Sequence, residues 1–362
     1  MRERLIEYDL LRIFAALAVI AIHITARYDL GSSWLVFLGN QATRNAVPMF
    51  IIMSGFVLYF ADRQRWLPIQ FFLSRRFGRV LNPYIFWTVI YVLATAWFYR
   101  QFWPDTQSFA ISLAKHLMFG TGFFHLYFLI IIFQLYLLYP LLRIWLKRYP
   151  GSLLLLSFVL TLTGQTLVYL SELKLITLPY LGFLYCTLFP LWLFYFVLGM
   201  YMAAHTKEMA NLVRGREWLL GILTLLSLGL LLADSYYTRV YIAIKPSLIL
   251  YTLLGHFFLY SVALRWKEWF SRWESPIRWL ADQSFLIYLS HPLVLSILFF
   301  GVPSRWWAYP WQGDLPMLAL YLLVVLASTG FCYLVSLTPA ATLIGGVRIS
   351  KSWHSQEEQK KP

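Results

Sequence analysis

The sequence has few charged residues for its length. Asp, Glu, Lys and Arg make up 13% of its 362 residues, whereas a soluble domain carries about 25%. Hydrophobic residues make up 60% of the chain. No stretch is both long enough and polar enough to form a sizeable soluble domain. The composition therefore excludes an ordinary soluble protein and predicts an all-α, polytopic membrane protein.

The sequence also lacks the residue patterns of metal and nucleotide sites. Its two cysteines, Cys186 and Cys332, lie in apolar segments, which argues against a structural disulfide or zinc site. No Cys/His metal spacing, Walker loop or dinucleotide fingerprint is present. Carboxylates are scarce within the apolar segments, so a proton pump built on buried carboxylates does not fit. We therefore expect no metal.

Ten apolar segments are long enough to cross a bilayer, which takes about 20 residues each. They lie near residues 8–27, 44–62, 80–99, 123–143, 152–171, 185–204, 218–236, 247–264, 282–300 and 315–337. Together they predict one transmembrane domain, residues 1–340, followed by a cytoplasmic polar tail, residues 341–362.

The basic residues are distributed unevenly between the two sets of connections. Of the 30 Lys and Arg residues, 21 fall in the termini and in the connections that lie on the same side as the termini, and 8 fall on the other side. The positive-inside rule then places both termini in the cytoplasm. We expect a multi-pass protein of the bacterial cytoplasmic membrane, in contact with membrane lipid. Because topology explains the net charge of +14, no nucleic-acid partner is implied.

Two ionisable residues, Arg12 and His23, lie inside the first apolar segment. Ionisable groups inside a membrane are costly and mark a functional site by default. Eleven helical residues turn about 20° past three full turns and rise roughly 16 Å, so both side chains share one helix face. Asp9 stands three residues before Arg12 and can pair with it. The alternative is a snorkelling Arg and a His that only packs between helices.

Three further groups of residues are candidate site residues. Arg75, Arg76 and Arg79 lie at the cytoplasmic start of a predicted helix, where guanidinium groups suit phosphates, although ordinary positive-inside charge explains them equally well. His125 opens a predicted helix on the outer side. His291 lies at mid-depth and is followed by a proline, which removes a helical hydrogen bond. Each His could instead be an interfacial or carbonyl-bonded side chain.

Five blocks in this order resemble the acyltransferase 3 family of integral-membrane acyltransferases. The matching residues are Asp9, Arg12 and His23; Arg44, Val47, Pro48, Phe50, Ser54 and Gly55; Arg75, Arg76, Arg79 and Pro83; His125, Leu126 and Phe128; and Ser284, Ile287, Tyr288 and His291. The chain departs from the family pattern at Tyr127, where Trp is usual. The resemblance covers residues 1 to about 340. Its segments 194–201 and 288–292 look like the intercellular-adhesin branch, and the pattern is also similar to the enterobacterial common antigen O-acetyltransferase.

The resemblance implies transfer of an acyl group, with acetyl expected, from cytoplasmic acyl-CoA to a hydroxyl of a surface polysaccharide or lipid-linked glycan. Arg75, Arg76 and Arg79 would then bind the CoA phosphates, Arg12 would hold the donor arm, and His23 would be the general base or an acyl carrier. In the same hypothesis Asp9 supports Arg12, and Arg44, His125 and His291 contact the acceptor.

Two other functions remain open from the sequence. The first is a polysaccharide exporter or flippase without covalent chemistry. The second is a scaffold subunit of the polysaccharide synthesis machinery. An exporter should tolerate Gln in place of His23, whereas the chemical hypothesis requires an imidazole there.

Overall fold

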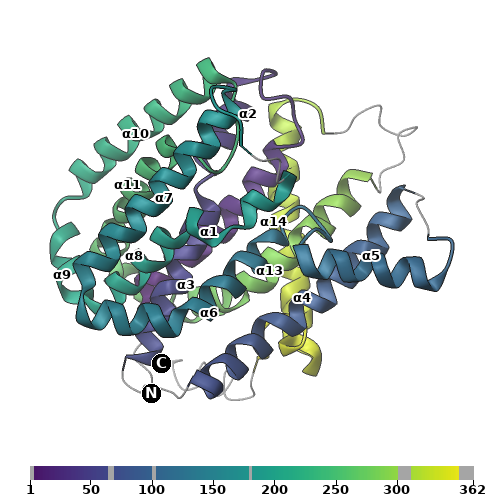
Figure 1. Ribbon diagram of the computed structural model, residues 1–362, viewed down its shortest axis with the longest axis horizontal. Coiled ribbons are helices and arrows are strands. Elements are labelled where there is room, and N and C mark those ends of the chain that lie inside the picture. The colour runs from purple at the N-terminus through teal and green to yellow at the C-terminus, as the bar shows by residue number, and fades with distance from the viewer. Residues whose placement is uncertain (1–3, 64–68, 100–102, 179–181, 301–310, 350–362) are drawn as a thin grey trace.

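The protein forms a helical bundle, shown in the computed structural model in Figure 1. The structure describes residues 4–63, 69–99, 103–178, 182–300 and 311–349. Within these ranges every regular element is a helix and no strand occurs, which confirms the all-α prediction. Lipid offers the backbone no hydrogen-bond partners, so helices that satisfy their own N–H and C=O groups are the expected solution.

The first half of the chain forms helices α1 to α7, of which α5 lies at the periphery of the bundle (Figure 1). Its elements are α1 (Ile6–Thr25), α2 (Trp34–Ala42), α3 (Ala46–Asp62), α4 (Ile69–Tyr99), α5 (Thr106–Phe119), α6 (Tyr127–Arg148) and α7 (Pro150–Glu172). The second half follows with η1 (Gly182–Thr187), η2 (Phe189–Leu191), α8 (Leu193–Ala204), α9 (Thr206–Val213), α10 (Glu217–Thr238), α11 (Pro246–Arg265), α12 (Lys267–Ser271), α13 (Glu274–Phe300), α14 (Asp314–Ser336) and η3 (Pro339–Thr342).

Nine helical segments among the described residues are long and apolar enough to cross a membrane. The remaining predicted segment, 185–204, does not form one continuous spanning helix. Its continuous helix, α8, has 12 residues and is about 18 Å long, which is less than the ~30 Å hydrocarbon core. Two short 3₁₀ turns precede it, and Pro190 in the second turn carries no backbone N–H. The segment therefore enters the bundle irregularly and ends in a short helix that is buried for most of its length.

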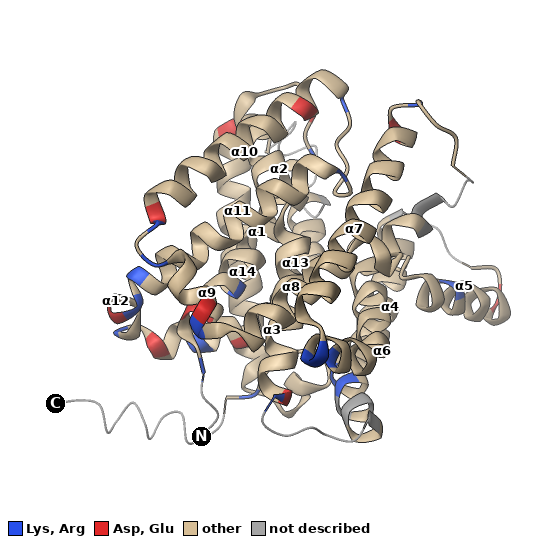
Figure 2. Cartoon of the chain, turned by 60° about the vertical axis from the view of Figure 1, so that its left-hand side comes forward, with Lys and Arg blue, Asp and Glu red and all other residues tan. Residues whose placement is uncertain are grey.

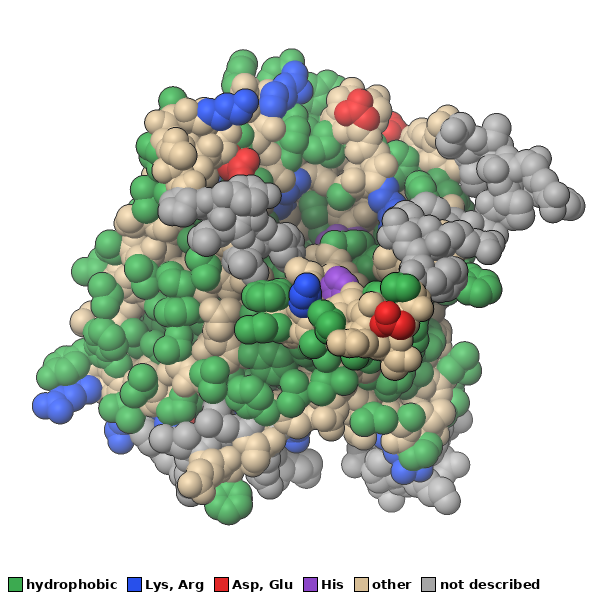
Figure 3. Space-filling model, turned by 45° about the vertical axis from the view of Figure 1, so that its right-hand side comes forward, with side chains coloured by type: hydrophobic (Ala, Val, Ile, Leu, Met, Phe, Trp, Pro, Cys, Tyr) green, Lys and Arg blue, Asp and Glu red, His purple; other side chains and the backbone are tan. Residues whose placement is uncertain are grey.

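The surface is typical of a membrane protein. Hydrophobic side chains cover a broad part of the face shown in Figure 3. Many are large and fully accessible, such as Trp218 at 84% and Leu315 at 79% exposure, and this would be unfavourable in water. Lys and Arg gather mainly at the lower end of the bundle in Figure 2, near α9, α12 and the end of α6. The protein is therefore a multi-pass membrane protein with a basic end.

Helices α3 and α8 pack against each other with glycine at the contact. A Cβ atom at Gly55 would overlap the carbonyl oxygen of Phe196, and one at Gly199 would overlap the carbonyl oxygen of Ile52. Small residues at helix crossings let two backbones approach closely inside a membrane. This contact fixes α3, whose residues reach both of the cavities described below.

Helix α13 continues through Pro292 rather than breaking there. The hydroxyl of Tyr91 is inserted at this point: it donates to the carbonyl of Leu289 at 2.6 Å and accepts from the N–H of Leu293 at 3.2 Å. An inserted side chain of this kind re-satisfies backbone groups that the proline disturbs. The hydroxyl from α4 thus bridges Leu293 and Leu289, the pair next to the bond that the proline removes, and supports the helix beside His291.

The beginning of the predicted polar tail is packed against the bundle. The indole N–H of Trp87 donates to the carbonyl of Ile344 at 2.9 Å, and the amide of Gln283 donates to the carbonyl of Val347 at 2.7 Å. Residues 341–349 therefore belong structurally to the helical domain. The rest of the predicted tail, 350–362, lies outside the described residues.

Candidate active site

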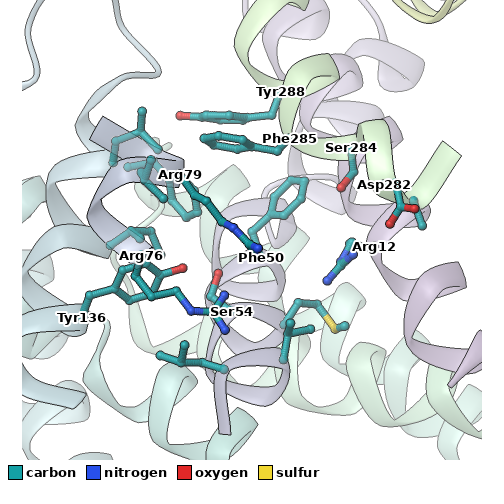
Figure 4. Close-up of a pocket in the computed structure, with 18 of the residues that line it drawn as sticks. Arg12, Phe50, Ser54, Arg76, Arg79, Tyr136, Asp282, Ser284, Phe285 and Tyr288 are labelled. Carbon is teal, nitrogen blue, oxygen red and sulfur yellow. The ribbon is translucent and has the colours of Figure 1, made fainter. Parts of the chain in front are cut away.

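A cavity of about 290 Å³ opens beside α1, α3, α4 and α13, and three arginines line it. We call it the arginine cavity. In Figure 4 the side chains of Arg12, Arg76 and Arg79 extend toward its middle from α1 and α4. Asp282 is the one acidic residue among its described lining residues. The cavity therefore carries excess positive charge.

The carboxylates near Arg12 are neutralised mainly by another residue. Arg4 donates to Asp9 through two nitrogens, at 2.6 and 3.0 Å, and pairs with Asp282 at 3.0 Å. Burial alone would lower the pKa of Arg4, but these two carboxylates raise it above its ordinary value. The predicted pairing of Asp9 with Arg12 is therefore replaced by pairing with Arg4, which approaches from before the helix. Arg12 has no hydrogen bond or ion pair among the described residues.

The two arginines from α4 face Tyr136 of α6 and Ser54 of α3 across the arginine cavity (Figure 4). Arg76 is half-buried and Arg79 is exposed, so both can meet a soluble ligand. Arg75 lies in α4, but its side chain is outside the described residues. Guanidinium groups at a cavity mouth are suited to phosphate oxygens, since their N–H groups form bidentate charged hydrogen bonds.

A second cavity, of about 350 Å³, lies toward the other end of α1 and contains histidine. We call it the histidine cavity. His23, Arg44, His125 and Tyr127 are among its lining residues, together with Asn40. Figure 3 shows histidine side chains in and beside a hollow on one face of the molecule. The spacing of Arg12 and His23 thus places one residue at each of two cavities along a single helix.

Three histidines lie together here: His23 from α1, His125 from the turn before α6, and His291 from α13. The ring centroids of His23 and His291 are 5.4 Å apart, and those of His125 and His291 are 5.9 Å apart. His291 is fully buried and uses Nδ1 to contact the carbonyl of Ile287 at 3.0 Å. Neither ring nitrogen of His125 has a hydrogen-bond partner, nor has Nε2 of His291. The cluster therefore offers free imidazole nitrogens for proton exchange.

The two cavities share two aromatic residues, Phe128 and Tyr288. Their ring centroids are 5.2 Å apart, and the Tyr288 hydroxyl donates to the backbone carbonyl of His125. Phe50 completes the contact, with its centroid 6.1 Å from each of the other two rings. We call Phe50, Phe128 and Tyr288 the partition. It separates the arginine cavity from the histidine cavity.

Arg44 is the cation of the histidine cavity. Its terminal nitrogens donate to the carbonyl of Tyr241 and to the side-chain oxygen of Asn40. None of the described residues that line the cavity is acidic. The guanidinium is therefore fixed in orientation, while its charge has no carboxylate partner inside the cavity.

The structure brings most of the predicted site residues into these two cavities. His23, Arg44 and His125 line one, and Arg12, Arg76 and Arg79 line the other. His291 stacks on His23 but does not line the histidine cavity. Asp9 is bound by Arg4 and does not line the arginine cavity. Sequence reasoning gave no special role to Phe128, Asn40 or Lys245. In a chain with 19% aromatic residues, no local signal separates a partition from ordinary packing.

A family model described as an acyltransferase domain matches residues 5–337. The chain belongs to the acyltransferase 3 family. Membership indicates a membrane acyltransferase, and the matched range covers all the helices that build the two cavities. No curated protein and no solved structure matches the chain, so the two branches suggested by its motifs stay predictions. The described residues hold no group of three or more His, Cys, Asp or Glu side chains placed to bind a metal ion.

Proposed function

We propose that this acyltransferase moves an acyl group, with acetyl expected, from acyl-CoA to a hydroxyl of a cell-surface polysaccharide or its lipid-linked precursor. The observation that carries the proposal is the pair of cavities on one helix, α1, with arginines in one and histidines in the other. The positive-inside prediction puts the arginine cavity on the cytoplasmic side of the bacterial membrane, where acyl-CoA is found.

The arginine cavity is the proposed donor site. CoA is polyanionic through its phosphates, and Arg76 and Arg79 are accessible guanidinium groups at this cavity. Arg75 would extend the same cluster. Arg12 also lines this cavity and has no ion pair among the described residues. It would hold the donor arm, which would point toward the partition. These roles use charge complementarity and need no metal.

The histidine cavity is the proposed acceptor site. His23 would take the proton from the acceptor hydroxyl while that oxygen bonds to the carbonyl carbon of the thioester. The C–S bond then breaks, and the CoA thiolate takes up the proton that His23 received. The products are the glycan ester and free CoA, so atoms and charge balance. His125, which also lines the cavity, would contact the acceptor, and His291 would hold the His23 ring through their stacked contact.

The geometry gives less support to an exporter. A glycan conduit needs a continuous polar passage, whereas the partition of three aromatic rings lies between the two cavities. Family membership also favours covalent chemistry over export. A thioester arm is slender and would need only a small opening between these rings, whereas a chain of sugars is much wider.

The deciding experiment measures transfer of labelled acetyl from acetyl-CoA in membrane vesicles that carry the native glycan. We expect wild-type protein to label the glycan and His23→Gln to lose at least about 100-fold in rate, the lower end of the usual range for one acid–base group. His205→Gln is the matched control, because His205 lies at the end of α8 and lines neither cavity. Glycan crossing without any transfer of label would refute the enzyme proposal.

Donor kinetics test the arginine cavity separately. Arg76→Ala combined with Arg79→Ala should raise KM for acetyl-CoA by about tenfold or more, since charged hydrogen bonds contribute about 1.5–3 kcal/mol each. Arg272→Ala is the control, an exposed arginine outside both cavities. An unchanged KM in the double variant would remove these residues from the donor site.

A further inference from the structure

A chain of buried polar side chains ends at Arg44. Lys245 is fully buried, and its ammonium group donates to the hydroxyl of Ser235 at 2.5 Å. Ser235 donates to the side-chain oxygen of Gln41 at 2.8 Å, and Gln41 donates to the side-chain oxygen of Asn40 at 3.0 Å. The same Asn40 oxygen accepts from Arg44. Helices α2 and α10, the turn after α2 and the residue that precedes α11 therefore contribute to one hydrogen-bond chain that reaches the histidine cavity.

The direction of every bond in this chain is fixed. Lys and Arg side chains can donate but cannot accept. Both ends are therefore donors, and the bonds from Lys245 and from Arg44 converge on the oxygen of Asn40. Buried networks are rigid where their members are satisfied, and among the polar atoms of these five side chains Nε of Arg44 is the one buried atom without a partner. The charge of Lys245 is balanced by Asp234 at 3.3 Å, so the chain ends in an uncompensated cation only at the cavity.

Asn40 also ties this cation to the helix that carries the proposed base. Its amide donates to the hydroxyl of Thr25 at 3.3 Å, and Thr25 lies two residues after His23 on α1. Asn40 is 1% exposed, so these bonds are shielded from solvent. One side chain thus sets the position of Arg44 relative to His23.

We propose that Arg44 is the group that stabilises the oxyanion of the acyl-transfer step, and that Asn40, Gln41, Ser235 and Lys245 are positioning residues that hold it. The inference rests on the proposed function. When the acceptor oxygen adds to the thioester carbonyl, negative charge develops on the carbonyl oxygen. A fixed donor placed beforehand at that charge stabilises it without reorganising. When the C–S bond breaks, the carbonyl re-forms and the charge on its oxygen disappears.

The alternative role for Arg44 is to bind an anionic group of the acceptor. Such groups are best held by two free terminal nitrogens in a fork. Here each terminal nitrogen already donates one bond, to Tyr241 and Asn40. One N–H on each terminal nitrogen remains, and Nε of Arg44 has no hydrogen-bond partner. Both roles are therefore open to these donors, and the effect on Vmax distinguishes them: an oxyanion donor acts on the chemical step, whereas an acceptor contact changes the dependence on acceptor.

The test uses membrane vesicles from cells in which each variant replaces the native chain, with labelled acetyl-CoA as the donor. Arg44→Ala should lower Vmax by about 100- to 1,000-fold, the usual loss for one oxyanion donor, with little change in KM for acetyl-CoA. Added guanidinium ion should restore part of that Vmax, because the shortened side chain leaves room beside the cavity. A misfolded protein would not respond to guanidinium.

Ser235→Ala tests the positioning chain, because it removes the link between Lys245 and Gln41. We expect Vmax to fall about tenfold, since a small displacement of a catalytic group has effects up to about 100-fold, and Ser235→Thr to restore it. Ser227→Ala is the matched control: Ser227 is buried two turns earlier on α10 and bonds within its own helix, to the carbonyl of Thr224. It should keep wild-type kinetics.

The outcomes separate the two hypotheses. If wild-type protein transfers no label, the proposed function fails. If wild-type protein is active but Arg44→Ala keeps its Vmax, changes only the dependence on acceptor, or gains nothing from guanidinium, the oxyanion role is wrong. If Ser235→Ala behaves like Ser227→Ala, the positioning role of the chain is wrong.

Discussion

The partition between the two cavities predicts that one hydroxyl group controls how often they connect. Tyr288 is 2% exposed, and its hydroxyl donates to the backbone carbonyl of His125. Replacing Tyr288 by Phe keeps the ring and its contact with Phe128 but removes this bond. The closed arrangement should then be weakened while the walls of both cavities stay almost unchanged.

The size of the effect follows from that single bond. A hydrogen bond between neutral groups contributes about 0.5–1.5 kcal/mol to a folded arrangement, and more where the abandoned partner stays buried. Taking about 1–1.4 kcal/mol, the open population should rise about five- to tenfold. The Phe50 and Phe128 rings are unaltered, so the increase should not reach the much larger value expected if a whole ring were removed.

Thiol labelling measures this opening directly. The chain has two cysteines, so Cys186→Ser with Cys332→Ala gives a background without thiols. Ser54→Cys then places one thiol in the arginine cavity. In the orientation predicted by the positive-inside rule, a membrane-impermeant thiol reagent added to the outside of intact cells would reach this thiol through the partition. The labelling rate should rise about five- to tenfold in the Tyr288→Phe variant.

A matched control is available on α4. The hydroxyl of Tyr84 also donates to a backbone carbonyl, that of Leu117, at 2.6 Å, and Tyr84 lines neither cavity. Tyr84→Phe should therefore leave the labelling rate unchanged. The reasoning is refuted if Tyr288→Phe also leaves the rate unchanged, or if both variants raise it equally.

Two further predictions concern stability. Asp62→Ala should lower the free energy of unfolding by about 3–5 kcal/mol, because it removes the carboxylate of a buried ion pair with Arg143 at 2.8 Å. Denaturation in detergent would show this, and a loss below about 1 kcal/mol would contradict it. Gly199→Ala should destabilise the protein and lower acyl transfer together, since the new methyl meets the backbone of α3, whereas Gly229→Ala, with open space around it, should be neutral or slightly stabilising. Equal melting temperatures for the two glycine variants would overturn this reading of the α3–α8 contact.

The sequence predicts well the features that depend on one helix at a time. Apolar length gave the spans, and the eleven-residue spacing placed Arg12 and His23 on one face of α1, where each reaches a different cavity. Such features follow from helix periodicity alone. The short α8 was not expected, because an apolar segment of the right length carries no sign that its first half is irregular apart from Pro190.

Contacts between different helices could not be predicted from the sequence. His125 and His291 were separate candidates, and their closeness to each other depends on how the turn before α6 lies against α13. Asp9 was assigned to Arg12 by spacing, but Arg4 reaches it from outside the helix, where periodicity gives no information. Lys245 read as an ordinary charge in a connection, because its partners come from other segments of the chain.

The different charge states of the two cavities suggest why the site is divided. Three cations line the arginine cavity, and the one carboxylate among its described lining residues, Asp282, is already paired with Arg4, so the proposed polyanionic donor would be retained there. The histidine cavity has one fixed cation and imidazoles that can be neutral. Crossing the partition is unfavourable for phosphates, because desolvating an ion is costly, but not for a neutral thioester. On this argument the charge of CoA itself keeps the donor on one side while its acyl end reaches the other.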